Sequence, residues 1–381
     1  MTTIYFSRLD SEEIDPLESP FDPNLSVETP LFGKPKEIGH FSIDSERRIH
    51  FNRSQMKYLI FPLKMKNVYL DLKVNFVDDI FHEYVTLSKM YQTLQWLQYH
   101  QQLLKTEFSK ASTKTSNVDF VTVRGSLVLI MCTPYLNRNL RNQWEICATK
   151  YNGIIYFSAI DTDKDVAENK NATYMQRCYQ SWGYKFEQYV TTDHIDGLPD
   201  MSSKTHQLEE FCVILKNVLN DHKLLYKAEI DAVIPHRQPT PGYGETSCYT
   251  ELKTSKNCIT EDEKYCFNRY KSITWWAQSC LAGISEIICG KRSNDGIVRS
   301  IDVFRVNNLP QEAKDFWSAD VCLNFCDKFL NFLKRVVIED DYKIVYKFSY
   351  RSGNMIYCSK LINPELRYTI IPEWYTESLD E

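Results

Sequence analysis

Apolar and charged residues alternate in two short segments in the middle of the chain, residues 224–234 and 248–254. A period of two is typical of a β-strand, in which residues two apart project from the same face. Between these segments, residues 235–244 hold three prolines and two glycines, which is typical of a surface loop. The pattern predicts two short strands joined by a surface excursion.

Other segments show helical or strand periodicity. Helices are expected at residues 79–108, 173–181, 206–222, 270–290 and 318–337, the last with Ser318 as its N-cap. Strands are expected at residues 41–48, 57–62 and 183–190, and in two hairpins at 144–157 and 343–358. Asn152 and Gly153 fit a type I′ turn in the first hairpin, and residues 351–354 form the turn of the second.

One apolar run has two interpretations as a strand. Residues 120–133 are either a strand pair or one long strand bent at Gly125, because a glycine inside a strand pattern often marks a bulge. The mixture of hairpins and helices predicts an α+β fold with mixed β-sheets flanked by helices. We expect a single domain over residues 39–381. It follows an extended arm, residues 1–38, that is rich in Pro, Asp, Glu and Ser.

Composition allows a large core but argues against a generally basic surface. The chain has 381 residues, of which 43% are hydrophobic and 13% aromatic, enough for a substantial interior. Its formal net charge is −5, so any contact with nucleic acid should rest on a local basic channel or pocket.

The twelve cysteines are dispersed and form no Cys-x-x-Cys pair, which argues against a zinc site. No signal peptide and no apolar run near 18 residues is visible, so we expect a reduced, intracellular protein without a membrane span. No strong basic cluster of the nuclear-import type is present, and the sequence leaves nucleus against cytoplasm open.

The two alternating segments carry the candidate chemistry. Glu229 and Asp231 share one strand face, and Glu251 and Lys253 share another. Each tripeptide alone is common on a solvated strand face. If the strands pair, however, three carboxylates and an ammonium gather in one patch, where a divalent cation such as Mg²⁺ or Mn²⁺ is the natural partner. The lysine then suits orientation of a water molecule and stabilisation of charge on phosphorus oxygens.

Two further polar residues interrupt apolar patterns. Arg124 either pairs with a carboxylate in the core or points at a phosphate, and the pattern favours neither. Gln278, on the expected helix after Glu251 and Lys253, is either a hydrogen-bonded core glutamine or part of the site.

The order of these residues resembles a known superfamily. An Asp followed about twenty residues later by Glu-x-Lys on a second β-rich segment is similar to the PD-(D/E)XK nucleases. A RecB-type nuclease is the weaker match, because Ala282 stands where that group usually has Tyr. The chain more closely resembles the DXO-type decapping nuclease family, its fungal nuclear branch in particular. The motifs are residues 124–125, 183–187, 229–231, 251–255 and 275–278, within a resemblance that covers about 38 to 375.

The resemblance implies roles for individual residues. Metal ligands would be Glu187, Glu229, Asp231, Glu251 and the main-chain carbonyl of Leu252, which together hold two divalent cations, Mg²⁺ or Mn²⁺. Lys253 and Gln278 would address the scissile phosphate and the water. Arg124 and Gly125 would contact the RNA backbone, and Arg47 and Cys212 also align with substrate-contacting positions. Val123 stands where animal members have Trp.

The implied activity is metal-dependent hydrolysis at RNA 5′ ends. Its substrates would be single-stranded RNAs with an aberrant or non-standard 5′ end, in decapping, pyrophosphohydrolysis or removal of an NAD cap, with 5′-to-3′ exonuclease activity undecided. The resemblance also implies a nuclear location and a nuclear 5′-to-3′ exoribonuclease as partner. The alternative hypothesis is a non-catalytic protein that mainly stabilises that exoribonuclease. The complete set of Glu187, Glu229, Asp231, Glu251 and Lys253 favours the enzyme.

Overall fold

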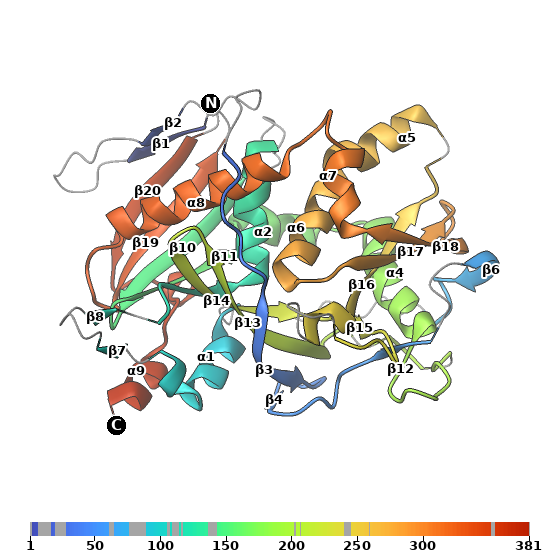
Figure 1. Cartoon of the computed structure of the whole chain (residues 1–381), viewed down its shortest axis with the longest axis horizontal. Coiled ribbons are helices and arrows are strands. Elements are labelled where there is room, and N and C mark those ends of the chain that lie inside the picture. The colour runs from blue at the N-terminus through green and yellow to red at the C-terminus, as the bar shows by residue number, and fades with distance from the viewer. Residues whose placement is uncertain are drawn as a thin grey trace.

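The structure is a computed structural model, and it describes residues 2–6, 17–19, 28–60, 65–75, 89–104, 107–108, 114–115, 117–135, 143–201, 203–205, 207–239, 245–258, 260–351 and 355–380. Within these residues the chain forms two large mixed β-sheets flanked by helices (Figure 1), which confirms the predicted α+β class. No helix in this part of the chain is both long and apolar enough to cross a membrane.

The first sheet has the strand order β2-β1-β20-β19-β10-β11-β9-β14-β13-β3-β4. Its strands are β1 (Thr2–Phe6), β2 (Leu17–Ser19), β3 (Lys36–Ile43), β4 (Ile49–His50), β9 (Phe120–Val123), β10 (Trp144–Tyr151), β11 (Ile154–Ile160), β13 (Glu210–Leu219), β14 (His222–Glu229), β19 (Ile344–Arg351) and β20 (Met355–Ile362). Strand β9 pairs in parallel with both β11 and β14, whereas β13 and β14 form an antiparallel hairpin.

The second sheet has the order β12-β5-β15-β16-β17-β18-β6. Its strands are β5 (Tyr58–Leu59), β6 (Met65–Asp71), β12 (Thr191–Thr192), β15 (Ala232–Val233), β16 (Tyr249–Lys256), β17 (Glu286–Arg292) and β18 (Ile297–Arg305), and a separate small hairpin joins β7 (Glu107–Phe108) to β8 (Lys114–Thr115). The chain passes directly from β14 in the first sheet to β15 in the second. The predicted carboxylate motif therefore lies where the chain crosses from one sheet to the other.

Helices cover the faces of both sheets. The α-helices are α1 (Tyr91–Gln98), α2 (Arg124–Cys132), α3 (Asp163–Lys170), α4 (Tyr174–Val190), α5 (Glu261–Cys266), α6 (Ser272–Ala282), α7 (Leu309–Glu312), α8 (Ala319–Val336) and α9 (Glu373–Asp380). Short 3₁₀ turns lie at Gln101–Leu103, Thr133–Tyr135, Glu245–Cys248, Val306–Asn308 and Leu366–Tyr368, and a π-helical turn at Phe267–Lys271 leads into α6.

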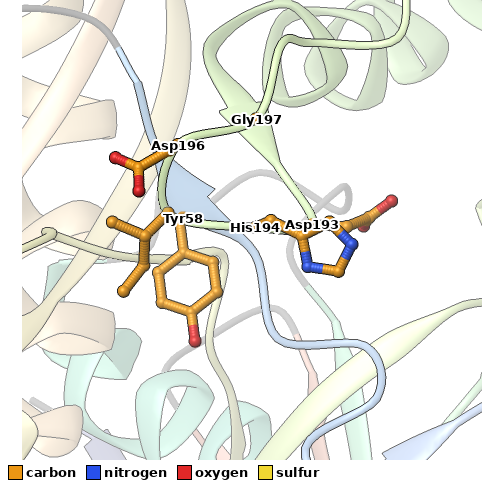
Figure 2. A pocket seen from close by; sticks show the side chains of 6 residues that line it. Tyr58, Asp193, His194, Asp196 and Gly197 are labelled. Atoms are coloured by element: carbon orange, nitrogen blue, oxygen red, sulfur yellow. The ribbon is translucent and has the colours of Figure 1, made fainter.

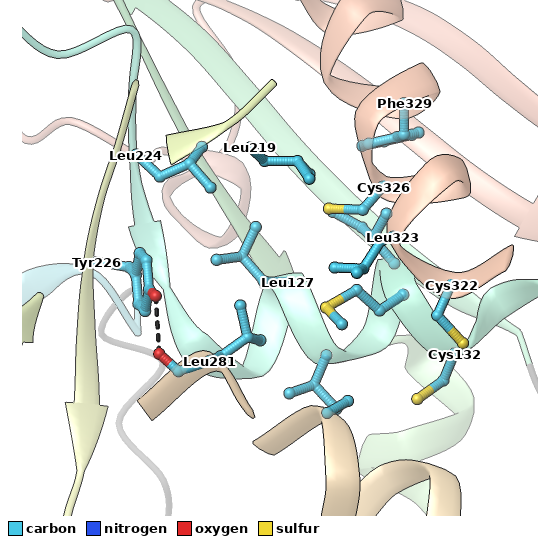
Figure 3. Packing of buried hydrophobic residues seen from close by; sticks show 14 of the residues in the cluster. Leu127, Cys132, Leu219, Leu224, Tyr226, Leu281, Cys322, Leu323, Cys326 and Phe329 are labelled. Carbon is cyan, nitrogen blue, oxygen red and sulfur yellow. Dashed lines mark hydrogen bonds between the residues drawn. The ribbon is translucent and has the colours of Figure 1, made fainter. Parts of the chain in front are cut away.

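The largest core cluster lies between the first sheet and helices α2, α6 and α8. Figure 3 shows Leu127 of α2 among residues of the β13–β14 hairpin and of α8. The hydroxyl of Tyr226 on β14 donates to the carbonyl of Leu281 on α6 over 2.7 Å, which joins the strand to that helix. A second cluster, around Trp96 and Tyr375, packs α1 and α9 on the other face of this sheet. The second sheet packs against α4 through Trp182.

Both predicted hairpins and the last long helix are confirmed. Asn152 and Gly153 have φ angles of 51° and 79°, as a type I′ turn requires, between β10 and β11. Strands β19 and β20 pair as expected, although residues 352–354 of their turn lie outside the described residues. Helix α8 begins after Ser318, but the Ser318 side chain makes no capping hydrogen bond, so the predicted cap is wrong in that respect.

The interpretation of residues 120–133 as strand is wrong after Val123. β9 ends there and α2 begins at Arg124, so Gly125 lies in the first turn of a helix. Every β9 residue is buried and most of α2 is buried too. A run that is apolar on all sides shows no period, which is why the pattern could not separate strand from helix.

Two more elements were assigned to the wrong class. Helix α4 continues through Gly183 to Val190, so the expected strand at 183–190 is helical. The expected helix at 206–222 is instead the strand β13, followed by the start of β14 at His222. β13 lies inside the sheet between β14 and β3, and its residues 211–215 are all buried. A strand buried on both faces loses its alternation and resembles a buried helix.

Two expected helices are shorter than predicted. In the 270–290 segment, α6 ends at Ala282 because Gly283 takes a left-handed conformation with φ 69°, and residues from Glu286 onward form β17. In the 79–108 segment the helix is α1, which ends at Gln98, while residues 76–88 lie outside the described residues.

The remaining predicted elements are placed in part. The segment 57–62 contains the short strand β5, and the segment 41–48 contains the end of β3 and a turn. In the 235–244 loop, residues 240–244 lie outside the described residues. The domain boundary at residue 38 stays a prediction, although β1 and the start of β3 place parts of the expected arm in the first sheet.

Close packing of α4 on the second sheet depends on a glycine. A Cβ at Gly290 of β17 would lie 2.6 Å from Cε2 of Phe186, a fully buried α4 residue. We expect Gly290→Ala to lower the free energy of unfolding by about 1–3 kcal/mol, because the ring has no room to move away. Denaturation in urea would measure the change. Gly183→Ala is the control, because a Cβ there meets nothing within 4 Å and alanine favours the helix. Equal unfolding free energies for the two variants would contradict this account.

Candidate active site

Glu229 and Asp231 lie where the chain crosses from one sheet to the other. Glu229 is the last residue of β14, and β15 begins at Ala232. β15 then pairs antiparallel with β16, with Ala232 opposite Thr250. The predicted pairing of the two alternating segments is thus confirmed for the part that follows the crossing.

The Asp231 side chain is hydrogen-bonded to the backbone of β16. The backbone N–H of Leu252 donates to Asp231 Oδ2 over 2.7 Å. Lys253 Nζ lies 3.7 Å from the same oxygen. Because the Asp231 side chain is only 10% exposed, little water competes with these contacts. A carboxylate from the crossing and an ammonium from β16 therefore converge, as the sequence predicts.

Glu251 is fully buried between two cations. Lys253 Nζ donates to Glu251 Oε2 over 2.6 Å, and the guanidinium of Arg124 pairs with Glu251 Oε1. Arg124 is the first residue of α2, directly after a strand of the first sheet, so this ion pair connects the two sheets across the site. Of the two interpretations of Arg124, the structure shows the carboxylate pairing.

The neighbouring charges separate the pKa values of the two central carboxylates. Burial is the largest influence on Glu251 and acts to raise its pKa, but Arg124 and Lys253 outweigh it and lower the pKa to about 2. Burial and then the charge of Glu251 raise the pKa of Asp231 to about 6. Glu251 is therefore held as an anion at neutral pH. Its negative charge in turn makes the ionised form of Asp231 less favourable.

Glu187 reaches this region from helix α4 and not from the strand that was expected. Burial, followed by the charges of Asp231 and Glu229, raises the pKa of Glu187 well above its ordinary value. Partial loss of solvent, followed by the charges of Glu210 and Asp231, raises the pKa of Glu229 to about 8. The Glu229 residue itself is exposed at the end of β14.

The donor set has the chemistry of a divalent-cation site. Four carboxylates, Glu187, Glu229, Asp231 and Glu251, face the two cations Arg124 and Lys253, which leaves excess negative charge. Carboxylate oxygens suit hard ions, and a bound cation would relieve the repulsion that raises these pKa values. Within the described residues, however, no three His, Cys, Asp or Glu side chains are grouped closely enough to form a metal site. The carboxylates therefore suit a divalent cation by their charge and by their oxygen donors, and their roles as metal ligands stay a prediction.

Two other predicted residues lie on the helices that pack beside this region. Gly125 is exposed in the first turn of α2, and a Cβ there would meet nothing within 4 Å, so the backbone is open on that side. Gln278 is half-buried on α6, and within the described residues its side chain makes no hydrogen bond. Of the two interpretations of Gln278, the structure therefore does not show the hydrogen-bonded core glutamine.

Arg47 and Cys212 lie on the first sheet, beside Glu229. The Cα atoms of Cys212 and Glu229 are antiparallel partners in the β13–β14 hairpin. Arg47 lies in the turn between β3 and β4 and donates from Nη1 to Glu210 Oε1 over 2.5 Å. Cys212 Sγ donates to the other carboxylate oxygen of Glu210 over 3.5 Å. The structure thus brings both predicted substrate contacts to a residue that the sequence analysis missed.

The signal for Glu210 was present in the sequence. Glu210 stands two residues before Cys212, and Lys227 stands two residues before Glu229, so each pair shares a strand face. Assigning residues 206–222 to a helix hid the first pair. When residues 210–219 are read as a strand, the alternation of strand faces places Glu210 on the same face as Cys212.

A surface pocket lies elsewhere on the second sheet. It has a volume of about 540 Å³ and is lined by Tyr58 and by five residues of the loop after β12, Asp193, His194, Ile195, Asp196 and Gly197 (Figure 2). None of the predicted site residues lines it. We therefore place the candidate active site at the junction of the sheets and not in this pocket.

An aspartate at a strand crossing, bonded to a neighbouring strand that carries Glu-x-Lys, defines the class of this protein: it has a PD-(D/E)XK nuclease-like core. A family model described as "RAI1 like PD-(D/E)XK nuclease" matches residues 33–376. The chain belongs to this family of RAI1-like PD-(D/E)XK nucleases.

Individual relatives agree with this membership. A "Decapping and exoribonuclease protein" of Xenopus laevis is 32% identical over 359 residues, which cover 92% of this chain and 87% of that protein. The Homo sapiens protein of the same name is 30% identical over 368 residues, covering 95% and 90%. The crystal structure of Candida albicans Rai1 in complex with pU5-Mn²⁺ has a TM-score of 0.75 at 18% identity and covers 93% of this chain and 96% of that chain. At that identity the structural match shows the shared fold.

Proposed function

We propose that this protein is a divalent-metal-dependent hydrolase that acts on the 5′ ends of RNA. The observation that carries the proposal is the convergence of Asp231, Glu251, Lys253 and Arg124 at the junction of the sheets. The decapping names of the full-length relatives and the RNA and Mn²⁺ bound by Candida albicans Rai1 support the choice of substrate and cofactor.

In this proposal two divalent cations, Mg²⁺ or Mn²⁺, bind at the carboxylates. Asp231, Glu251 and Glu187 would hold one with the main-chain carbonyl of Leu252, and Glu229 would join in the second. Bound cations would polarise the scissile phosphate and favour ionisation of the attacking water. Support comes from the excess of carboxylates over cations and from their raised pKa values.

The protein's own side chains would then orient the reacting groups. Lys253 is 23% exposed, so its ammonium is open to a ligand while two carboxylates hold it in place. This suits a role in positioning water and stabilising charge on the phosphate oxygens. Gln278, whose amide is uncommitted within the described residues, would add a hydrogen bond to the phosphate or the water.

The start of α2 would receive the RNA backbone. Val123 occupies the N-cap position and makes no side-chain capping bond, so the first-turn N–H groups have no competing cap. A helix N-terminus favours phosphate through these N–H groups and the helix dipole. Gly125, which is open on its outer side, lets a backbone approach closely, and Arg124 adds positive charge at the same point.

Substrate range, location and partner are further parts of the proposal. We propose single-stranded RNA with an aberrant or non-standard 5′ end as substrate, because a site at a sheet junction within an acidic protein suits an unpaired end better than a long duplex. A nuclear location and association with a nuclear 5′-to-3′ exoribonuclease rest on the motif resemblance of residues 38–375 alone.

Product analysis tests this function. The purified protein would be incubated with 5′-triphosphate, unmethylated-cap, NAD-capped and 5′-hydroxyl RNAs in Mg²⁺ or Mn²⁺, with EDTA as the parallel condition. We expect metal-dependent release of pyrophosphate, a cap dinucleotide, NAD or a 5′ dinucleotide, and the released fragment would name the specificity. If no RNA is cut although the protein binds metal and an exoribonuclease, the protein is a stabilising partner and the enzymatic proposal fails.

A further inference from the structure

Glu210, which has none of the roles above, is the centre of a charged network on the first sheet. Its carboxylate accepts the 2.5 Å bond from Arg47 and the 3.5 Å contact from Cys212, and Lys227 Nζ lies 3.5 Å from Glu210 Oε2. The Glu210 side chain is 19% exposed. Three neighbours from three different strands or turns therefore share one carboxylate.

Arg47 is held in an unusual backbone conformation. Its φ of 64° lies in the left-handed region, which an arginine seldom adopts. The side chain of Asp44 stabilises this turn by accepting hydrogen bonds from the N–H groups of Glu46 and Arg48, at 3.0 and 2.9 Å. Backbone strain of this kind persists where the surrounding structure fixes a residue for a purpose.

The Arg47 side chain is fixed through one nitrogen. Nη1 donates both to Glu210 and to the carbonyl of Leu208, over 2.9 Å for the latter. Within the described residues, the donors on Nε and Nη2 make no further hydrogen bond. An arginine has five N–H donors in a rigid fork, so this one is oriented while the rest of its fork stays available, and its side chain is 36% exposed.

Lys227 completes the network and connects it to the active site. It lies two residues before Glu229 on β14, so both side chains share a face of the strand. Its Cα is the parallel partner of Val123, which directly precedes Arg124. The Lys227 side chain is 13% exposed, and one carboxylate faces both it and Arg47. The group therefore keeps one uncompensated positive charge beside the carboxylates of the active site.

We propose that Glu210 is a positioning residue of the reaction: it holds Arg47 and Lys227 as a pair of phosphate-binding donors beside Glu229. This inference rests on the proposed function, because it assumes that RNA phosphates pass this edge of the site. Glu210 itself touches no substrate. Its negative charge lies beside the RNA path, so simple electrostatics and positioning predict opposite effects when that charge is removed.

The experiment compares Glu210→Gln and Glu210→Asp with the unchanged protein. Without positioning, removing a carboxylate near RNA would tighten binding. With positioning, Glu210→Gln should raise KM for a 5′-triphosphate or capped RNA roughly tenfold, as loss of supporting residues does, with kcat within about threefold. Glu210→Asp keeps the charge but shortens the reach, so its KM should rise as well. A KM that falls or stays constant in Glu210→Gln would overturn the inference.

A double-mutant cycle separates positioning from general damage. If Glu210 acts through Arg47 and Lys227, the loss of RNA affinity in the double variant Arg47→Ala with Glu210→Gln should be clearly smaller than the product of the two single losses. Independent, multiplying losses would overturn the inference. Glu145→Gln is the matched control. Glu145 is also a strand residue, is 20% exposed, and pairs with Lys347 over 3.2 Å away from this network. Equal losses in Glu145→Gln and Glu210→Gln would show a merely structural role.

Fluorescence anisotropy with the same RNA in EDTA keeps this inference distinct from the proposed function. If the unchanged protein cuts no RNA but the binding cycle behaves as expected, Glu210 positions a binding surface and the hydrolase proposal fails. The protein could also cut RNA while the losses of RNA affinity in the two single variants simply multiply, or while neither variant loses affinity. The hydrolase proposal then stands and the role of Glu210 is refuted. If the protein neither binds nor cuts RNA, both fail.

Discussion

Glu251→Gln is expected to lower kcat/KM for RNA hydrolysis by at least about 10³-fold. Glu251 is the fully buried carboxylate that pairs with Arg124 and Lys253 and, in the proposed site, contacts a cation. Glutamine keeps the shape but removes the charge that holds Lys253 in place and that a hard cation requires. Initial rates under saturating and limiting RNA, with Mg²⁺ or Mn²⁺ present, measure the loss.

A matched control is available on the neighbouring strand. Glu286 of β17 is 1% exposed and pairs with two arginines, Arg237 and Arg305, as Glu251 pairs with two cations. Breaking a buried ion pair by changing one partner is destabilising by about 3–5 kcal/mol, so both variants should lose comparable stability. Glu286→Gln should nevertheless keep near-normal kcat/KM per folded molecule. A Glu251→Gln protein that is folded and as active as Glu286→Gln would remove Glu251 from the active site.

Lys253→Met is expected to lower kcat by about 10²–10³-fold while changing KM by less than about threefold. The ammonium contacts Glu251 over 2.6 Å and lies 3.7 Å from Asp231, and it is partly open to solvent. Methionine fills much the same space but removes the positive charge that would stabilise the phosphate oxygens as charge develops on them. Because all four carboxylates stay in place, metal binding should persist, and calorimetric titration with Mn²⁺ would check it.

Lys291→Met is the control for this second prediction. Lys291 lies on β17, is 9% exposed, and its ammonium lies over the rings of Phe267 and Phe304, outside the proposed site. Its removal should lower stability slightly and leave kcat unchanged. A Lys253→Met variant with unchanged kcat, or one whose kcat falls together with a loss of Mn²⁺ binding, would contradict the role given to Lys253.

The local pattern sufficed for the two segments that carry the carboxylate motif. The alternation in 224–234 and 248–254 placed Glu229, Asp231 and the Glu251–Lys253 pair on strands or at their ends, and the structure has them there. The turn at Asn152 and Gly153 could also be predicted from these two residues alone. A type I′ turn needs positive φ at both positions, which Asn and Gly adopt more readily than other residues.

The pattern failed in two segments that contain fully buried runs. Residues 120–123 and 211–215 are all buried, so the sequences there carry neither period clearly. Helix α4 is longer than the predicted helix at 173–181 for a different reason: a glycine inside a helix is unfavourable but tolerated, and α4 runs through Gly183 to Val190.

The sequence by itself determined the order of the motifs, the α+β class, the family resemblance and the identity of the charged residues. The tertiary structure alone decided which of those charges meet. Arg124 pairs with Glu251 from 127 positions away because the start of α2, directly after a strand of the first sheet, lies beside β16 of the second. Arg47 meets Glu210 across 163 positions because Arg47 follows β3, which pairs with β13 in the first sheet. Such contacts depend on how distant elements pack together in space. The periodicity of a local sequence segment contains no information about which distant segment lies beside it.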